Sequence, residues 1–178
     1  MSDTLLYIGG AGLIFALLLV WLVATYNRFI RLANRVDESW SDIDTELKRR
    51  YELIPNLVDV VKGYALHEKS TLEAVLKARE RAIASKDSPE TQAKDENPLV
   101  NAVAKLIALG ESYPQLKADA EFLALQKQLA NTEDRLQTAR RVFNGNTREF
   151  NILMASFPSN LVAHAFGFRR KAFFEIDR

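Results

Sequence analysis

The sequence predicts an all-α protein in which an N-terminal transmembrane helix continues into an antiparallel bundle of about four long helices. Three observations predict this class. An uncharged apolar segment lies near the N-terminus, the remainder is rich in strong helix formers, and apolar residues recur there at alternating steps of three and four. We expect an anchor over residues 1–27, a soluble helical bundle over 28–165 and an aromatic, basic tail over 166–178.

The charges of the 178-residue chain nearly balance, with 24 basic and 23 acidic residues. Proteins that bind nucleic acids normally carry a clear basic excess, so this balance argues against a nucleic-acid partner. The chain has no cysteine, which excludes disulfides and thiol chemistry.

The apolar segment Leu5–Ala24 is the predicted anchor, because its 20 residues carry no charge. At ~1.5 Å per residue, a helix of this length spans ~30 Å, the thickness of the hydrocarbon core of a bilayer. A cleaved signal peptide would need a basic start, a shorter apolar run and a small-x-small cleavage site. The sequence fits none of these requirements, so we expect a retained transmembrane helix.

The residues that flank this segment predict its orientation. Aromatic side chains suited to the membrane–water interface lie at its two ends: Tyr7, Trp21 and Tyr26. Basic residues follow the segment but do not precede it: Arg28, Arg31 and Arg35. The positive-inside rule therefore predicts an external N-terminus and a cytoplasmic location for the bulk of the chain.

Residues 27–56 predict the stem that carries the anchor into the bundle. No start or stop signal separates stem from anchor, so we expect one helix from about residue 4 to about residue 53, ended by Pro55. Apolar residues follow the seam of a helix in a bundle: Phe29, Ala33, Val36, Trp40, Ile43, Leu47 and Ile54. Arg50 occupies the remaining position of this seam.

Three further segments follow Pro55. We expect a second helix over 56–84 that returns antiparallel to the stem, because the link between them is short. Its apolar face comprises Leu57, Val61, Ala65, Leu72, Val75 and Ala82. The polar stretch 86–98 contains two prolines and predicts an exposed loop. A short third helix is expected over 99–109, ended by Gly110 and Pro114.

A long fourth helix is expected over residues 116–157, closed by Pro158. Its apolar face comprises Phe122, Leu125, Leu129, Leu136, Ala139, Phe143, Phe150, Leu153 and Phe157. Thr132 and Asn146 interrupt this face. The segment Asn144–Asn146 is the weakest point and a candidate kink, because Gly145 is a poor helix former.

The C-terminal tail combines aromatic with basic side chains, a mixture suited to an anionic membrane surface. It would arrive near the membrane if the fourth helix returned along the stem. The tail aromatics either contact lipid or cap the bundle, and the sequence leaves both interpretations open. The predicted interface comprises Trp21, Tyr26, Arg28, Arg31, Phe166, Phe168, Arg169, Arg170, Lys171, Phe173 and Phe174.

Arg50 predicts a buried ion pair, because an uncompensated charge in a protein interior is strongly destabilising. Glu68 on the second helix and a carboxylate on the fourth helix are candidate partners. Alternatively, Arg50 reaches solvent while its aliphatic part stays packed. The predicted network of polar residues between helices comprises Arg35, Asp37, Asp44, Arg49, Arg50, Glu68 and Arg140.

No residue set in the sequence predicts a catalytic, metal or cofactor site. His67-Glu68 lacks the second histidine, four residues on, that a zinc-protease helix requires. Asp37 and Asp44 share a helix face that Asp42 does not, which favours charge pairs over a metal site. We therefore predict a protein that is not an enzyme and holds no cofactor.

Two long stretches of the chain closely resemble the LemA family of bacterial membrane proteins. The first is NRVDESWSDIDTELKRRYELIPNLV (34–58), which continues into VKGYALHEKSTLEAVLKAR (61–79). The second comprises YPQLKA (113–118), TEDRL (132–136) and FPSNLVAHAFGF (157–168). The resemblance implies a bacterial cytoplasmic-membrane protein with an N-terminal anchor and a helical bundle, and it implies no reaction. Genes of family members often lie in the same neighbourhood as genes of membrane metalloproteases, and one branch of the family takes part in magnetosome membrane formation.

These observations favour a scaffold or adaptor that is anchored in the membrane by a single pass. We expect it to form homo-oligomers or to bind other membrane proteins. The alternatives are a membrane-remodelling protein that binds lipid and a regulatory partner of a membrane protease.

Overall fold

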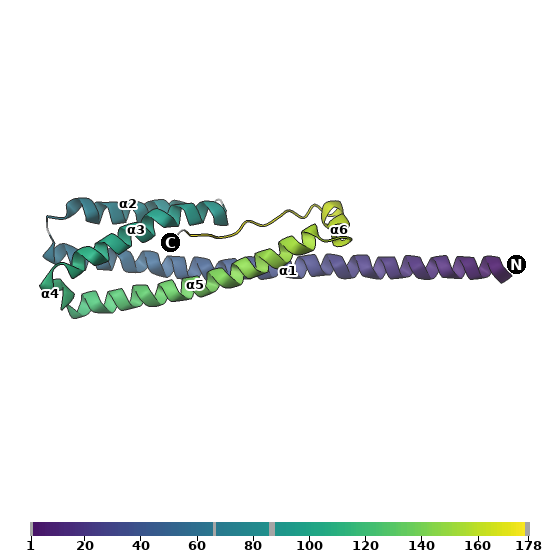
Figure 1. Cartoon of the computed structure of the whole chain (residues 1–178), viewed down its shortest axis with the longest axis horizontal. Helices are drawn as coiled ribbons and strands as arrows, with labels where there is room; N and C mark the ends of the chain where they lie inside the picture. The colour runs from purple at the N-terminus through teal and green to yellow at the C-terminus, as the bar shows by residue number, and fades with distance from the viewer. Residues whose placement is uncertain (1, 66, 86–87, 177–178) are drawn as a thin grey trace. The chain divides into compact units, whose positions relative to one another are not determined.

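The computed structural model describes residues 2–65, 67–85 and 88–176, with side chains from residue 7 onward. This part of the chain contains six helices and no strand, which confirms the all-α prediction (Figure 1). The helices are α1 (Ser2–Tyr64), α2 (Lys69–Ala84), α3 (Pro89–Glu111), α4 (Pro114–Lys117), α5 (Ala120–Ala155) and α6 (Ser159–Ala165).

The N-terminal part of α1 is apolar around its whole circumference. Its side chains from Tyr7 to Trp21 are exposed, so no other described part of the chain covers them. A helix that is apolar on every side needs an apolar surrounding. Among the described residues, α1 is the one helix long and apolar enough to cross a membrane.

The prediction that Pro55 ends the first helix is wrong, because α1 continues through Pro55 to Tyr64. Proline has no amide hydrogen, so the carbonyl of Tyr51, four residues earlier, loses its helical donor. The Arg79 side chain on α2 replaces that donor, with 2.6 Å between its Nε and the Tyr51 carbonyl oxygen. A side chain of α2 therefore supplies the hydrogen bond that Pro55 removes from the backbone of α1.

The prediction of a single second helix over 56–84 is also wrong, because these residues belong to two helices. Its first part belongs to α1, and α2 begins only at Lys69. The predicted apolar face is nevertheless buried throughout: Leu57, Val61, Ala65, Leu72, Val75 and Ala82. A straight helix through Ala84 would carry Leu72 and Val75 away from the core. Instead, α2 runs antiparallel to the end of α1 (Figure 1).

The predicted loop over 86–98 is wrong, because α3 begins at Pro89 and includes Pro98. Ser88 caps the helix by accepting a hydrogen bond from the Thr91 amide at 3.1 Å. Pro89 occupies the first helical position, where a missing amide hydrogen does no harm. The helix then places Gln92 and Glu96 in the core and lies beside α2.

The expected end of the third helix is close to the observed one at Glu111. Gly110 allows the Phe122 ring to lie directly on this helix end. A Cβ at Gly110 would stand 2.5 Å from Cζ of Phe122, a distance that no packed side chain tolerates. Close packing against Phe122 therefore requires a glycine at this position.

The predicted fourth helix divides into α4 and α5 around Asp119. Oδ1 of Asp119 accepts hydrogen bonds from the amides of Glu121 and Phe122, each at 2.9 Å. Oδ2 accepts one from the Tyr64 hydroxyl at 3.0 Å. The Phe122 amide and then the Tyr64 hydroxyl hold the pKa of the Asp119 carboxyl below its ordinary value. α5 continues unbroken through Asn144–Asn146.

The described residues form two compact units. Residues up to Asp37 and from Asn146 to Lys171 form the anchor unit, and residues 38–145 with 172 onward form the core unit. α1 and α5 contribute to both units. The predicted seam is largely correct within them, since Phe29, Val36, Ile43, Leu47 and Ile54 are buried. Ala33 and Trp40 of this seam are half-buried. Phe157, predicted on the apolar face of the fourth helix, lies beyond the end of α5 and is 80% exposed.

The contact between Arg79 and Tyr51 gives the first testable prediction. Arg79→Met should lower the free energy of unfolding by about 1–3 kcal/mol, because it leaves the buried Tyr51 carbonyl without a donor. In a Pro55→Ala background the same substitution should do much less, because the alanine backbone supplies the missing amide hydrogen. Circular dichroism of the full chain in detergent during denaturation measures both effects.

Arg81→Met is the matched control for this cycle. Arg81 forms an exposed ion pair with Asp95 at 2.7 Å, so its loss should change stability by less than ~1 kcal/mol. An equal loss for Arg79→Met in both backgrounds would show that the Tyr51 carbonyl is not what Arg79 stabilises.

Candidate membrane interface and buried polar network

The anchor unit places an aromatic cluster directly after the apolar segment of α1. The ring of Tyr26 lies 4.8 Å from that of Phe166 and 5.9 Å from that of Phe168, centroid to centroid. Phe29 stacks on Phe168 at 4.7 Å and meets the edge of Phe150 at 5.9 Å. Residues 166–168 therefore pack against α1 where it leaves its apolar segment.

The turn after α6 directs these residues toward α1. Gly167 adopts a φ of 72°, and its amide donates to the His164 carbonyl at 3.3 Å. The Phe168 amide donates to the Ala163 carbonyl at 3.0 Å. These two bonds form a Schellman motif, which favours glycine because of its left-handed conformation. Ala-Phe-Gly-Phe is thus a helix-end signal that the sequence already carries.

Several large apolar side chains in the anchor unit remain exposed. The exposed fractions are 57% for Ile152, 58% for Leu161 and 52% for Phe166, beside the 80% for Phe157. Ile152 and Phe157 border a pocket whose other wall includes Trp21, Thr25 and Arg28 of α1. The end of α5 and the start of α6 therefore lie beside the end of the apolar segment.

The structure divides the predicted interface residues into exposed and buried groups. The exposed group comprises Trp21, Arg28, Arg31, Phe166, Arg169 and Arg170. Tyr26, Phe168, Lys171 and Phe173 are half-buried. Lys171 pairs with Asp37, with 2.9 Å between Nζ and Oδ1, so its charge is directed to the stem.

Phe174 does not belong to a membrane interface, because its side chain is fully buried. It meets the Trp40 ring edge-on at 5.5 Å. The Asn144 side chain holds its backbone, donating to the Phe174 carbonyl and accepting from the Phe174 amide, each at 3.0 Å. Asn151 likewise donates to the Lys171 carbonyl at 2.9 Å and accepts from the Lys171 amide at 3.0 Å. Two asparagines of α5 therefore fix the tail.

A network of buried polar groups lies in the core unit around Glu96, which is fully buried. Arg50, only 4% exposed, donates from Nη1 to Oε2 of Glu96 at 2.8 Å and from Nη2 to Glu133. The Tyr51 hydroxyl donates to Oε1 of Glu96. The Gln92 amide nitrogen lies 3.0 Å from the same oxygen. The network joins α1, α3 and α5.

Burial of Tyr51 raises the pKa of its hydroxyl, and the negative charge of Glu96 raises it further. Both effects disfavour a tyrosinate, since the ionised oxygen would lose hydration and stand against a carboxylate. Tyr51 therefore stays a neutral donor to Glu96.

The sequence predicts that Arg50 pairs with Glu68 or with a carboxylate of the fourth helix. The structure places Glu133 of α5 at this position, whereas Glu68 lies half-buried at the start of α2. Sequence reasoning missed Gln92 and Glu96 because it assigned 86–98 to a loop, and it therefore also missed the partner of Tyr51. Gln92, Glu96 and Leu99 are spaced as one helix face, and that spacing was the available signal.

The remaining residues of the predicted network make mostly local contacts. Asp44 pairs with Lys48 at 2.7 Å and Arg49 with Glu46 at 3.8 Å, each within α1. The Arg35 carbonyl accepts a hydrogen bond from the Asn146 side chain at 3.2 Å. Arg140 is half-buried on α5. Exposed pairs of this kind contribute little stability individually.

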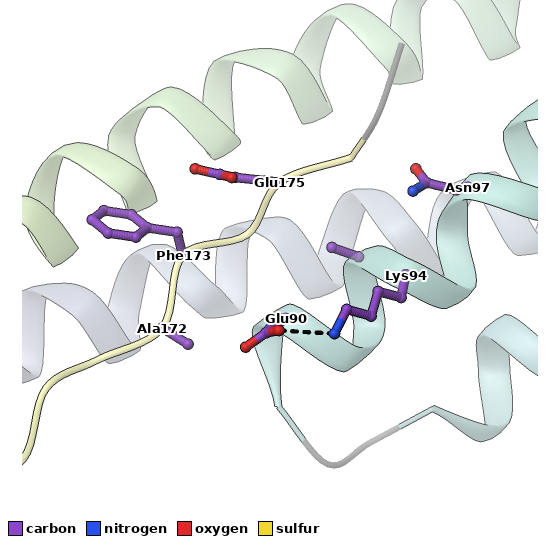
Figure 2. A pocket seen from close by; sticks show the side chains of 7 residues that line it. Glu90, Lys94, Asn97, Ala172, Phe173 and Glu175 are labelled. Carbon is purple, nitrogen blue, oxygen red and sulfur yellow. Dashed lines mark hydrogen bonds and ion pairs between the residues drawn. The ribbon is translucent and has the colours of Figure 1, made fainter.

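A pocket of the core unit lies between α3 and the extended C-terminal segment (Figure 2). Glu90 and Lys94 form an ion pair across one turn of α3 at 2.8 Å. The hydrogen bond from Lys94 holds the pKa of the Glu90 carboxyl below its ordinary value. Phe173 and Glu175 come from the C-terminal segment. This pair is solvent-exposed, and among the described residues no cluster of metal-binding side chains occurs.

The Arg50 ion pairs give the second prediction. Arg50→Met should destabilise the protein by about 3–5 kcal/mol, because it leaves the Glu96 charge buried without its cation. Adding Glu96→Met should recover much of this loss, since an apolar pair replaces the charges. Denaturation of the full chain in detergent measures both, with Lys48→Met as the exposed control. An Arg50→Met protein as stable as the wild type would contradict a required buried pair.

Tyr51 gives the third prediction. Its pKa is raised in the folded state, so its contribution to stability is complete below pH ~10 and declines as the pH rises further. Tyr51→Phe should lower stability at pH 7 through the lost hydrogen bond, and the gap to the wild type should narrow above pH ~10. Unfolding free energies of both proteins across this pH range test it. A constant gap would show that Tyr51 does not titrate with unfolding.

Comparison with known proteins identifies relatives in two groups. The magnetosome protein MamQ 2 of Paramagnetospirillum magneticum is 24% identical over 179 residues, covering 86% of this chain and 66% of its own length. The magnetosome protein MamQ of Magnetospirillum gryphiswaldense is 22% identical, with 86% and 65% covered. Protein LemA of Metamycoplasma hominis is 25% identical over 160 residues, with 88% and 73% covered. The chain thus spans slightly less than two thirds of the MamQ proteins.

The family model of the LemA family matches residues 39–178. The match covers most of the chain and begins after the apolar segment of α1. It includes the network around Glu96 and the two asparagines that hold the tail. The chain therefore belongs to the LemA family, whose members are membrane-associated helical proteins.

Proposed function

We propose that this protein is a membrane-tethered scaffold or adaptor that assembles with itself or with other membrane proteins. The observation that carries the proposal is the continuity of α1, which runs for 63 residues from the apolar segment into the core unit. The core unit is therefore joined directly to the apolar segment through α1, and it is the part of the chain that would bind partners.

The construction of the core unit supports this role. The network around Glu96 joins three helices through Arg50, so the module keeps a defined surface. That surface exposes large apolar side chains on α5, among them Leu123 and Val142. A protein that binds this surface would cover these side chains.

A second candidate function is lipid binding that shapes the membrane. The exposed apolar side chains at the end of α5 and on α6 favour it, because they lie beside the apolar segment of α1. The similarity to magnetosome proteins is compatible with either candidate. Tubulation or clustering of liposomes by the purified protein would distinguish membrane remodelling from a scaffold.

The proposed location is the bacterial cytoplasmic membrane, with the N-terminus outside and the core unit in the cytoplasm. The basic residues after the apolar segment support this orientation. Because the chain has no cysteine, a single introduced cysteine reports its own position. Asp3→Cys should react with an impermeant maleimide in intact cells, and Glu73→Cys only after the membrane is opened. The reverse pattern would contradict the orientation.

The scaffold proposal predicts that the native protein is part of a larger assembly. Extraction in a mild detergent, followed by mass measurement and identification of co-purifying proteins, should give an oligomer of this chain or a complex with other membrane proteins. Detergent exchange into a harsher detergent that leaves the helical signal intact should dissociate it, which controls for unfolding. A lone monomer at native concentration would contradict the proposal.

A further inference from the structure

We propose that the end of α5 and α6 form a second membrane attachment, which inserts into the interface of the membrane that α1 crosses. The surface, here called the α6 patch, comprises Ile152, Phe157, Leu161 and Phe166, with Arg169 and Arg170 following in the chain. The ligand is the bilayer surface itself, with a preference for anionic lipid. This inference rests on the anchoring of α1 and does not require self-assembly.

The depth of the α6 patch follows from its contacts with α1. If Leu5–Ala24 fills the hydrocarbon core, Trp21 lies ~4.5 Å inside its boundary and Tyr26 ~3 Å outside, at ~1.5 Å per residue. Phe157 borders the same pocket as Trp21 and Thr25. The Phe166 ring lies 4.8 Å from that of Tyr26. Both ends of the patch are therefore held at the level where headgroups meet acyl chains.

The exposure of these side chains is explained by such a location. The turn around Pro158 is built from polar contacts, in which the buried Ser159 hydroxyl donates to the carbonyls of Leu153 and Ser156, at 2.7 and 2.9 Å. This fixed turn leaves Phe157 80% exposed while Val162 and Ala163 of α6 face the interior. In water such exposure is unfavourable, whereas at a membrane interface it is the binding surface.

Charge favours lipid as the occupant of the patch. Arg169 and Arg170 are exposed, and Arg28 and Arg31 of α1 are exposed in the same unit. Lys171, by contrast, is directed to Asp37. Arginines that follow an interfacial apolar surface bind the anionic headgroups of the cytoplasmic leaflet. An apolar face with a basic border matches the arrangement of interfacial helices.

The test uses the full chain in proteoliposomes, with Leu161→Cys carrying an environment-sensitive fluorophore. The patch should sit about 5–10 Å deep, so quencher groups on the upper acyl chain should reduce emission about twofold or more. Leu123→Cys, an exposed leucine of the core unit, is the matched control and should not be quenched. Phe157→Cys should behave like Leu161→Cys.

Two further sets of variants separate the apolar contribution to membrane binding from the contribution of the arginines. Phe157→Asp should reduce quenching at residue 161, because a charge resists insertion into the interface. Phe157 is exposed, so the helical signal should stay unchanged and verify the fold. Arg169→Gln with Arg170→Gln should weaken quenching in vesicles with phosphatidylglycerol and leave it unaltered in pure phosphatidylcholine.

Two outcomes of the fluorescence experiment would overturn the inference. A water-exposed fluorophore at residue 161 in both lipid compositions would show that the α6 patch does not touch the bilayer. A fluorophore shielded from water but untouched by lipid quenchers would assign the patch to a protein, such as a second copy of this chain. A monomeric mass contradicts the scaffold and leaves this inference intact, so the two failures are distinguishable.

Discussion

The buried Glu96 carboxylate imposes the constraint on which the core unit depends. A carboxylate removed from water must be compensated by donors or by positive charge. Arg50 supplies the charge from α1, and Tyr51 and Gln92 supply further donors. These groups reach Glu96 only when α1 and α3 hold one relative position. Arg50 extends the same constraint to α5 through Glu133. The contacts of the network are therefore satisfied together when α1, α3 and α5 take this arrangement.

A second constraint acts on the backbone of α1. Every buried carbonyl needs a donor, and Pro55 removes the one that Tyr51 would have received. Arg79 replaces it from α2, which allows α1 to remain a single helix to Tyr64. Tyr51 thus takes part in both constraints, through its carbonyl at the proline and through its hydroxyl at Glu96. Tyr51 thereby connects the packing of α2 on α1, through Arg79, with the burial of the Glu96 carboxylate.

The C-terminal tail illustrates how side chains can substitute for a sheet neighbour. An extended segment exposes amides and carbonyls that need partners, and Asn144 and Asn151 each supply one donor and one acceptor. The two asparagines are seven residues apart, or ~10.5 Å along a helix. The three residue-to-residue steps of extended chain from Lys171 to Phe174 cover ~10 Å. The sequence showed Asn144 only as a weak point in a helix, because its partner lies thirty residues away.

The sequence alone predicts the class of the fold, the length of the apolar segment and most of the buried positions. These are local properties, since the period of a helix decides which residues share a face and residue type decides whether that face is apolar. It also determined that Arg50 stands in an apolar seam, but not that Glu96 would join Glu133 there. Tertiary contacts decided whether the chain stays helical at its prolines. Pro55 and the stretch 86–98 read as interruptions, but Arg79 satisfies the carbonyl freed at Pro55, and Arg50 stabilises Glu96 of α3 in the core. It also decided that Phe174 is buried while Phe157 is exposed, because that depends on which chain segments return to cover each ring.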